Sequence, residues 1–279
     1  MNELFAIRLG GLGDLLVILP SLRLLRRALP GRRLILRCRP ECGALLRDRG
    51  VVDEVVSADA ADRRPDAPGL RIGWFQAPTS VPAGPGRFFV FDPSAGTAVG
   101  RFFFDRTAGF VRDHGLSTEP DFEACARLPG AQPASRGGPV ILHPGSGGIR
   151  KCWPLDRFLA LAEALALRGF HGRFVTGEAD ARIAVPLREA ALPLHWDHRD
   201  SPSLAALAGM LESAPLYVGN DSGVTHLAAA CGAPVVALFR TEYAVHWRPS
   251  GRTTVLAAEA VDGIPFESVA SAAFAAANV

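Results

Sequence analysis

Lysine is almost absent from this sequence, and other absences narrow what the chain can be. Arginine supplies all but one of the 30 basic positions, the exception being Lys151. No apolar run approaches the roughly 20 residues that cross a bilayer. Residues 1–9 lack the charged-then-apolar pattern of a cleaved signal peptide and are expected to form a strand. We therefore expect a soluble protein of the cytoplasm.

Cysteine is also sparse, and its spacing does not suit a metal. The five cysteines are an odd number, form no C-x-x-C pair and have no histidine at zinc-ligand spacing. The sequence likewise has no acidic pair at metal-ligand spacing. We expect reduced thiols, no metal site and no cofactor.

The length and the hydrophobic pattern indicate two α/β domains. At 279 residues the chain exceeds the roughly 100–200 residues of one domain. Strand-like runs alternate with helical patterns, as in parallel sheets covered on both faces. A segment rich in Pro, Gly, Ala and Ser at 128–139 is expected to be the linker. We predict two Rossmann-like, doubly wound domains, 1–133 and 134–279, with the last helix able to pack back on the first.

The expected elements follow from apolar runs and helical spacing. Strands are predicted at 4–9, 34–38, 54–57, 72–75, 88–91, 140–143, 173–176, 216–218 and 235–239. Helices are predicted at 15–29, 40–49, 154–168, 179–191, 203–213 and 222–231. In such sheets ligands bind beyond the carboxyl ends of the strands, so the loops there are the candidate sites.

The first candidate loop, residues 8–14, reads Arg-Leu-Gly-Gly-Leu-Gly-Asp. Its glycines, Gly10, Gly11 and Gly13, let the backbone approach a ligand, and Asp14 stands at the mouth of the next helix. The dinucleotide fingerprint is incomplete, because Leu16 replaces its third glycine and strand two ends in arginines instead of an acid. An NADP-dependent oxidoreductase therefore remains only as an alternative.

The second candidate loop, residues 143–154, could hold phosphate with its glycine-rich backbone and basic side chains. It departs from a P-loop, because Arg150 stands in place of the second glycine and Cys152 in place of the Ser or Thr that binds magnesium. Lys151 is the one lysine of the chain. It is a candidate phosphate ligand, and chance retention in an arginine-rich composition is the alternative.

The third candidate loop, residues 218–226, leads from a strand into a helix whose first turn offers amides to an anion. Asp221 and His226 are expected to project from the same place. Helix N-capping by Asp221 or Ser222, and burial of His226 in the core, are the structural alternatives.

Together, the three loops resemble glycosyltransferase family 9, the ADP-heptose:lipopolysaccharide heptosyltransferases. The resemblance covers 7–20, 143–158, 176–178, 217–239 and 246–249, and it is faint between about 58 and 130. It implies a GT-B fold, with an N-terminal acceptor-binding domain and a C-terminal nucleotide-sugar-binding domain that face a cleft. It also implies an inverting, metal-independent transfer of heptose from ADP-heptose to a hydroxyl of the lipopolysaccharide core or another glycan.

The resemblance also implies roles for single residues. Asp14 is the general base, and Lys151 stabilises the departing diphosphate. Gly10, Gly11 and Gly13 form the loop on the acceptor side. Donor binding falls to Ser146, Glu178, Asp221, Ser222, Gly223 and His226, with Asp180 as a second candidate beside Glu178.

The partners that follow are a nucleotide sugar and a glycan or glycolipid acceptor, without nucleic acid. Residues 1–50 hold ten arginines against four acids, so the first domain could carry a basic surface for a phosphorylated or membrane-attached acceptor at the inner membrane. Equally, those arginines could simply solvate helix faces. The alternative functions are a catalytically silent nucleotide-sugar binder and a GT-B transferase or epimerase using a UDP-sugar.

Overall fold

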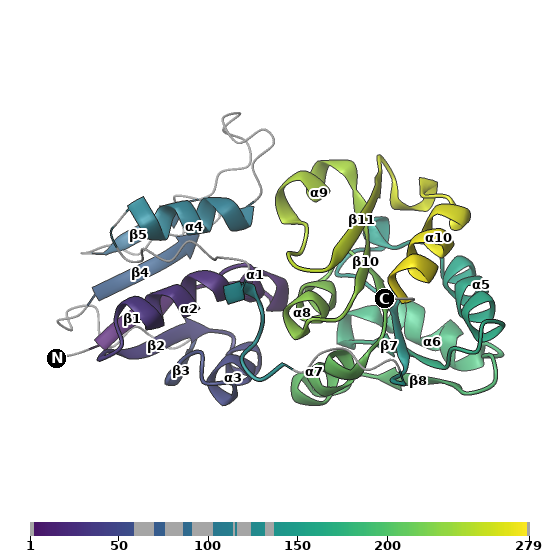
Figure 1. The fold of residues 1–279 in the computed structure, drawn as a ribbon, viewed down its shortest axis with the longest axis horizontal. Coiled ribbons are helices and arrows are strands. Elements are labelled where there is room, and N and C mark those ends of the chain that lie inside the picture. Colours follow the sequence, from purple (N-terminus) through teal and green to yellow (C-terminus); the bar gives the residue numbers. More distant parts are fainter. Residues whose placement is uncertain are drawn as a thin grey trace. The chain divides into compact units, whose positions relative to one another are not determined.

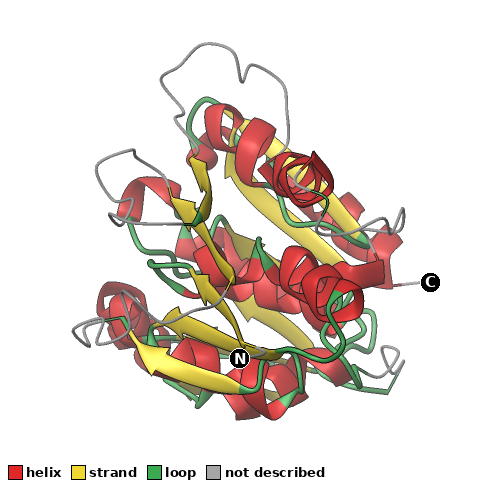
Figure 2. Ribbon diagram, turned by 90° about the vertical axis from the view of Figure 1, so that its left-hand side faces the viewer, coloured by secondary structure: helices red, strands yellow, loops and turns green. Residues whose placement is uncertain are grey.

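The computed structural model describes residues 3–58, 70–75, 86–90, 103–113, 115, 124–131 and 137–277. The chain divides into two compact units, residues 1–130 and 131–279. Each unit is a parallel sheet with helices packed on it (Figure 2). The expected boundary at 133/134 lies outside the described residues.

The first unit has a five-stranded parallel sheet in the order β3-β2-β1-β4-β5. Its buried strand side chains include Leu4, Leu34, Ile72 and Trp74. The Trp74 ring packs edge-on against Phe110 at 6.4 Å between centroids. The elements are β1 (Glu3–Ile7), α1 (Leu12–Leu16), α2 (Leu19–Ala28), β2 (Arg33–Cys38), α3 (Pro40–Asp48), β3 (Glu54–Ser57), β4 (Leu70–Phe75), β5 (Arg87–Val90) and α4 (Phe103–Asp113).

The second unit has a six-stranded parallel sheet in the order β11-β10-β9-β6-β7-β8. Its strands are β6 (Val140–His143), β7 (Gly172–Thr176), β8 (Trp196–Asp200), β9 (Tyr217–Asn220), β10 (Val235–Arg240) and β11 (Thr253–Ala258). Its helices are α5 (Leu155–Ala166), α6 (Ala181–Glu189), α7 (Leu204–Ser213), α8 (Gly223–Cys231), α9 (Thr241–Trp247) and α10 (Phe266–Ala277).

Both sheets have the strand order of a doubly wound nucleotide-binding fold. Counted from its own first strand, each runs 3-2-1-4-5, and the second adds a sixth strand at the edge. The direction of winding reverses between β1 and β4 in the first unit and between β6 and β9 in the second. A crevice for ligands forms at the carboxyl ends of the strands at such a point.

Helices cover both faces of the sheet in the second unit, and apolar side chains fill the space between the sheet and these helices (Figure 1). Val140, Leu142, Phe174 and Val218 alternate along their strands and face one side, as the two-residue period of a strand requires. Helices α5 and α10 pack together on that side, and α7 and α8 pack together on the other. The last helix, α10, thus packs within its own unit, and its expected contact with the first unit stays a prediction.

The strand β11 and the helices α4 and α9 were not predicted. Two other differences from the expectation have reasons that the residues supply. The helix predicted at 15–29 is two helices, α1 and α2, because Pro20 lacks an N–H and its ring clashes with the carbonyl four residues back. The strand β8 was not predicted, because its sequence, Trp-Asp-His-Arg-Asp, is charged; it forms an edge of the sheet, where charged side chains remain in water. Within the described parts of the chain, no helix combines the length and the hydropathy needed to cross a membrane.

Candidate functional site

The loops after β6 and β9 meet at the carboxyl edge of the second sheet, and Asn220 joins them. Its side-chain amide donates to the carbonyl of Pro144 at 2.8 Å, and its amide oxygen accepts from the backbone N–H of Trp153 at 2.9 Å. Asn220 is fully buried. The buried Asn220 side chain therefore connects the two loops, both of which the sequence indicated as candidate sites, by hydrogen bonds.

Lys151 lies in this place with Ser146 and Asp221. The Lys151 ammonium donates to Asp221 Oδ2 at 2.7 Å, and the Ser146 hydroxyl donates to the backbone carbonyl of Asp221 at 2.7 Å. The lysine side chain is 37% exposed and the aspartate 10%. The structure thus brings three of the predicted site residues together, with a positive charge that remains partly open to solvent.

Tyr243, which the sequence reading missed, completes the group from a third loop. It lies in α9, directly after β10, and its ring centroid is 4.6 Å from the Lys151 Nζ. The strands β10, β9 and β6 are neighbours, so Tyr243, Asp221 and Lys151 follow three adjacent strands. We call Ser146, Lys151, Asp221 and Tyr243 the Lys151 cluster. The only hint in the sequence was that α9 follows a buried strand.

A buried chain of hydrogen bonds lies beneath this cluster. His143 Nε2 is 3.2 Å from Asp180 Oδ2, and His143 Nδ1 is 3.3 Å from the Ser222 hydroxyl. His143 and Asp180 are 2% and 6% exposed, so neither side chain is open to a ligand as the structure stands. Asp180, the second candidate for ribose binding, is buried beside His143, and its proposed role stays a prediction.

The environment of Asp180 determines the pKa of its carboxyl. Burial raises the pKa of its carboxyl, but bonds from His143 and from the amides of Gly177 and Ser146 outweigh burial and leave the pKa below its usual value. The Ser146 amide thus donates to Asp180. The close packing also requires glycine at 145, where a Cβ would lie 2.1 Å from Asp180.

The start of α8 holds the remaining predicted donor ligands. Ser222 is the N-cap, and its hydroxyl accepts from the backbone N–H of Thr225 at 3.3 Å, so the capping alternative holds for this residue. Gly223 opens the helix, and His226 is 9% exposed in its second turn. Glu178 lies apart from this helix, exposed in the short turn after β7.

In the first unit, Asp14 is held by Arg8 across the reversal point of that sheet. Arg8, which directly follows β1, donates to Asp14 Oδ1 at 2.7 Å. It also donates to the backbone carbonyl of Trp74 on β4 at 3.1 Å. The Arg8 side chain is 2% exposed and that of Asp14 31%. Burial lowers the pKa of Arg8, and the Asp14 carboxylate acts in the opposite direction.

Asp14 is the third residue of α1, and the N-cap of this helix is Gly11. Its Oδ2 accepts from the Gly11 backbone N–H at 2.9 Å. Gly10 has φ +116°, and a Cβ there would lie 2.5 Å from the same oxygen. Gly13 is the second residue of α1. Gly10 and Gly11 therefore shape the place of the Asp14 carboxylate.

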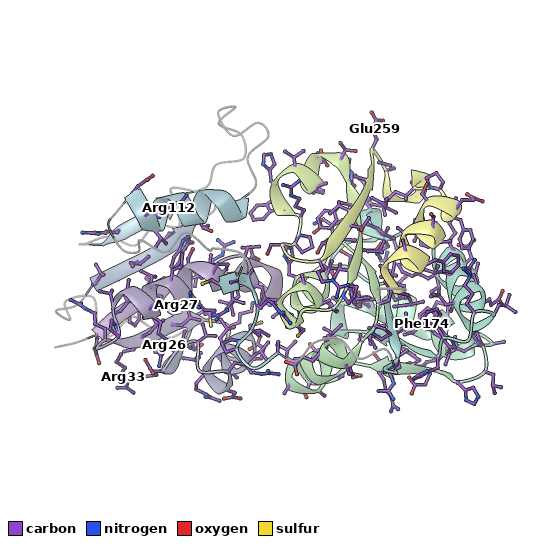
Figure 3. The ribbon with its side chains drawn as sticks, in the orientation of Figure 1. Arg26, Arg27, Arg33, Arg112, Phe174 and Glu259 are labelled. Carbon is purple, nitrogen blue, oxygen red and sulfur yellow. The ribbon has the colours of Figure 1, made fainter. Side chains whose placement is uncertain are left out.

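Several arginines of the first unit have partners of their own, and Figure 3 labels two of these arginines, Arg26 and Arg33. Arg26, on α2, forms a two-pronged bond to Asp53 at 2.8 and 2.9 Å, and Arg33 pairs with Glu54 at 2.8 Å. Arg23 donates to the carbonyls of Ala124 and Arg127. These pairs account for part of the positive charge that suggested a basic surface.

The thiols and the acidic side chains show no metal centre in the described part of the chain. None of the cysteines is in a disulfide, and burial raises the pKa of the Cys152 thiol to about 11. No group of three or more His, Cys, Asp or Glu side chains there has the arrangement of a metal site.

Comparison with known proteins gives the site its context. The family model described as glycosyltransferase family 9 (heptosyltransferase) matches residues 113–262, more than half of the chain. Lipopolysaccharide heptosyltransferase 3 of Escherichia coli is 30% identical over 119 residues, which cover 39% of this chain and 33% of the relative. The chain thus matches about a third of the length of that relative.

Solved structures are similar over nearly the whole chain. The family 9 glycosyltransferase of Veillonella parvula DSM 2008 has a TM-score of 0.80 at 17% identity, covering 99% of this chain and 97% of that one. The E. coli heptosyltransferase WaaC with ADP has a TM-score of 0.74 at 18% identity, covering 99% of this chain and all of that one. At such identities the likeness establishes the fold, and it is the GT-B fold expected. With the family match across 113–262, the chain belongs to glycosyltransferase family 9, the heptosyltransferases.

Proposed function

We propose that this protein transfers heptose, or a related sugar, from ADP-heptose to a hydroxyl of the lipopolysaccharide core or another glycan. The observation that carries the proposal is the Lys151 ammonium, held 2.7 Å from Asp221 at the carboxyl edge of the sheet. A cation there can bind the diphosphate of a nucleotide sugar. Family membership and the ADP named for the solved relative support this donor.

The transfer needs a base on the acceptor and a cation on the leaving group. We assign the base to Asp14, whose two oxygens are oriented by Arg8 and Gly11 while its side chain stays 31% exposed. It takes the hydroxyl proton as that oxygen attacks the anomeric carbon from the face opposite ADP, which inverts the configuration. General-base help is typically worth about 10²–10⁴-fold.

Lys151 neutralises the negative charge that grows on the diphosphate as the glycosidic bond breaks. Asp221, Ser222, Gly223 and His226 surround the donor, and the start of α8 offers it amides. Glu178 remains the proposed ribose ligand, in its exposed turn. In this mechanism the fixed ammonium provides the positive charge that a divalent metal provides in other transferases. We place the reaction on the cytoplasmic side of the inner membrane.

The direct test is ADP release from ADP-heptose in the presence of a heptose-free lipopolysaccharide acceptor. We expect turnover in a chelator and no gain from added Mg²⁺, Mn²⁺ or Fe²⁺. Turnover that a chelator abolishes and a metal restores would contradict the metal-free mechanism. Preference for a UDP-sugar would replace the donor, and ADP-heptose binding without transfer to any acceptor would favour the silent binder.

A substitution at Lys151 tests its role within that reaction. Because the charge on the leaving group grows in the transition state, Lys151→Ala should lower kcat by about 10²-fold or more and weaken ADP binding less. The kcat of Lys151→Arg should lie between those of Lys151→Ala and the unchanged protein, since a planar guanidinium replaces a compact ammonium. Equal losses in turnover and ADP affinity would mean that Lys151 binds the diphosphate equally in the ground state and the transition state.

A further inference from the structure

Tyr243 contacts the one lysine of the chain, and the proposed reaction assigns it no role. Its ring centroid lies 4.6 Å from the Lys151 Nζ, within the range of a cation–π contact. The side chain is half-buried in α9. The ring therefore faces the same ammonium that Asp221 binds at 2.7 Å.

A second cation lies near the same ring. The Arg240 guanidinium lies 5.6 Å from the same centroid. Arg240 is itself tied to Glu242 at 3.1 Å and to the backbone carbonyl of Glu259 at 3.0 Å. The Tyr243 ring thus lies near both a tethered arginine and Lys151.

Lys151 needs a support, because its side chain is long and flexible. Three rotatable donors on a four-carbon stem can point in many directions. The Asp221 carboxylate fixes the ammonium at one point, but a single contact leaves the stem free to swing about it. A ring face at 4.6 Å limits that motion.

We propose that Tyr243 is a positioning residue, whose ring holds the Lys151 ammonium on Asp221 so that its charge is already in place for the diphosphate of a nucleotide-sugar donor. The benefit to the donor rests on the proposed function. The hold on the ammonium does not, and it can be measured without any sugar transfer.

The first experiment uses Lys151 as its own reporter. Because the chain has no other lysine, acetylation by acetic anhydride at Lys151 can be followed by mass spectrometry of its peptide without ambiguity. We expect Tyr243→Ala to speed this acetylation about two- to fivefold, as the loss of one exposed cation–π contact implies. Tyr243→Phe keeps the ring and should match the unchanged protein.

Two further variants set the scale of the measurement. Val245→Ala alters an exposed side chain of the same helix, so it should leave the acetylation rate unchanged. Asp221→Asn removes the other partner of the ammonium and should speed the reaction at least as much as Tyr243→Ala. Equal rates in Tyr243→Ala and the unchanged protein would overturn the proposal.

The second experiment measures transfer. Tyr243→Ala should lower kcat about two- to fivefold with KM nearly constant, and Tyr243→Phe should restore it. A loss in Tyr243→Phe equal to that in Tyr243→Ala would assign the effect to the hydroxyl and overturn the role of the ring. If the unchanged protein transferred no sugar, the proposed function would fail, and acetylation would still decide the role of Tyr243.

Discussion

Asp14 has a structural duty as well as its proposed catalytic one. It supplies a carboxylate to Arg8, whose side chain is 2% exposed. Asp14→Asn should therefore abolish transfer and also lower the free energy of unfolding by about 1–3 kcal/mol, below the value for a fully buried pair because Asp14 is partly exposed. Urea denaturation measures this. Asn at this position would not act as an N-cap, because residue 14 is the third residue of α1.

A double-mutant cycle separates the pair from its surroundings. If Arg8 and Asp14 act together, the effects of Arg8→Lys and Asp14→Asn on stability should fail to add by about 0.5 kcal/mol or more. Additive effects would show that the contact contributes little. Donor binding by Asp14→Asn should stay near that of the unchanged protein, since the donor is assigned to the second unit.

Single site residues could be predicted where the residue type or its neighbours departed from the rest of the composition. Lys151 stood out because arginine occupies every other basic position, and Asp14 because it follows a glycine-rich turn. Tyr243 and Asn220 gave no such signal, since Tyr243 lies in a helix that the sequence did not predict and Asn220 reads as an ordinary residue at the end of a strand. Their roles depend on which strands are neighbours, and spacing along the chain does not encode that.

At the scale of elements, the loop after β6 depends on glycine at one position and tolerates substitution at another. A Cβ at Gly145 would lie 2.1 Å from Asp180, whereas one at Gly147 would meet nothing within 4 Å. Gly145→Ala should lower the free energy of unfolding by about 1–3 kcal/mol, as overpacking does. Gly147→Ala should stay within about 0.5 kcal/mol. Thermal or urea unfolding of the two variants checks this, and equal effects would contradict it.

The same loop ties stability to pH through Asp180. Its folded-state pKa lies below the usual value, so its contribution is fully present above a pH of about 4 and is lost as the pH falls through the folded-state pKa. The free energy of unfolding should therefore fall less steeply below pH of about 4 in Asp180→Asn than in the unchanged protein. Asp156→Asn, at an exposed position on α5, is the control. Equal slopes in all three proteins would refute the assignment.

Most elements were predictable because both sheets are parallel and buried. Their central strands are continuous apolar runs, such as Val140–His143, between turn residues. Prediction was poorer where that rule does not apply. The edge strand β8 is charged, and the break between α1 and α2 depends on Pro20 within an otherwise regular leucine pattern.

At the scale of the whole molecule, two units with separate sheets imply that a ligand of one need not stabilise the other. ADP at 100 times its dissociation constant adds about 2.7 kcal/mol to the part that binds it. Hydrogen exchange should slow by up to about 100-fold in the slowest amides of 137–277 and stay unchanged in 3–58. Equal protection of both ranges would show that the units unfold together or that both bind ADP.

The order of strands in the second sheet also determines at which stage of synthesis the Lys151 cluster can form. The Lys151 cluster needs the loops after β6, β9 and β10, which are neighbours in the sheet although β6 ends at residue 143 and β10 at residue 240. During synthesis the chain emerges from its N-terminus, so the loop after β6 leaves the ribosome long before Tyr243 does. A nascent chain that stops short of α9 has the loop after β6 but lacks the Tyr243 contact of the Lys151 cluster. If the proposed donor site is correct, we expect donor binding to require synthesis at least through α9.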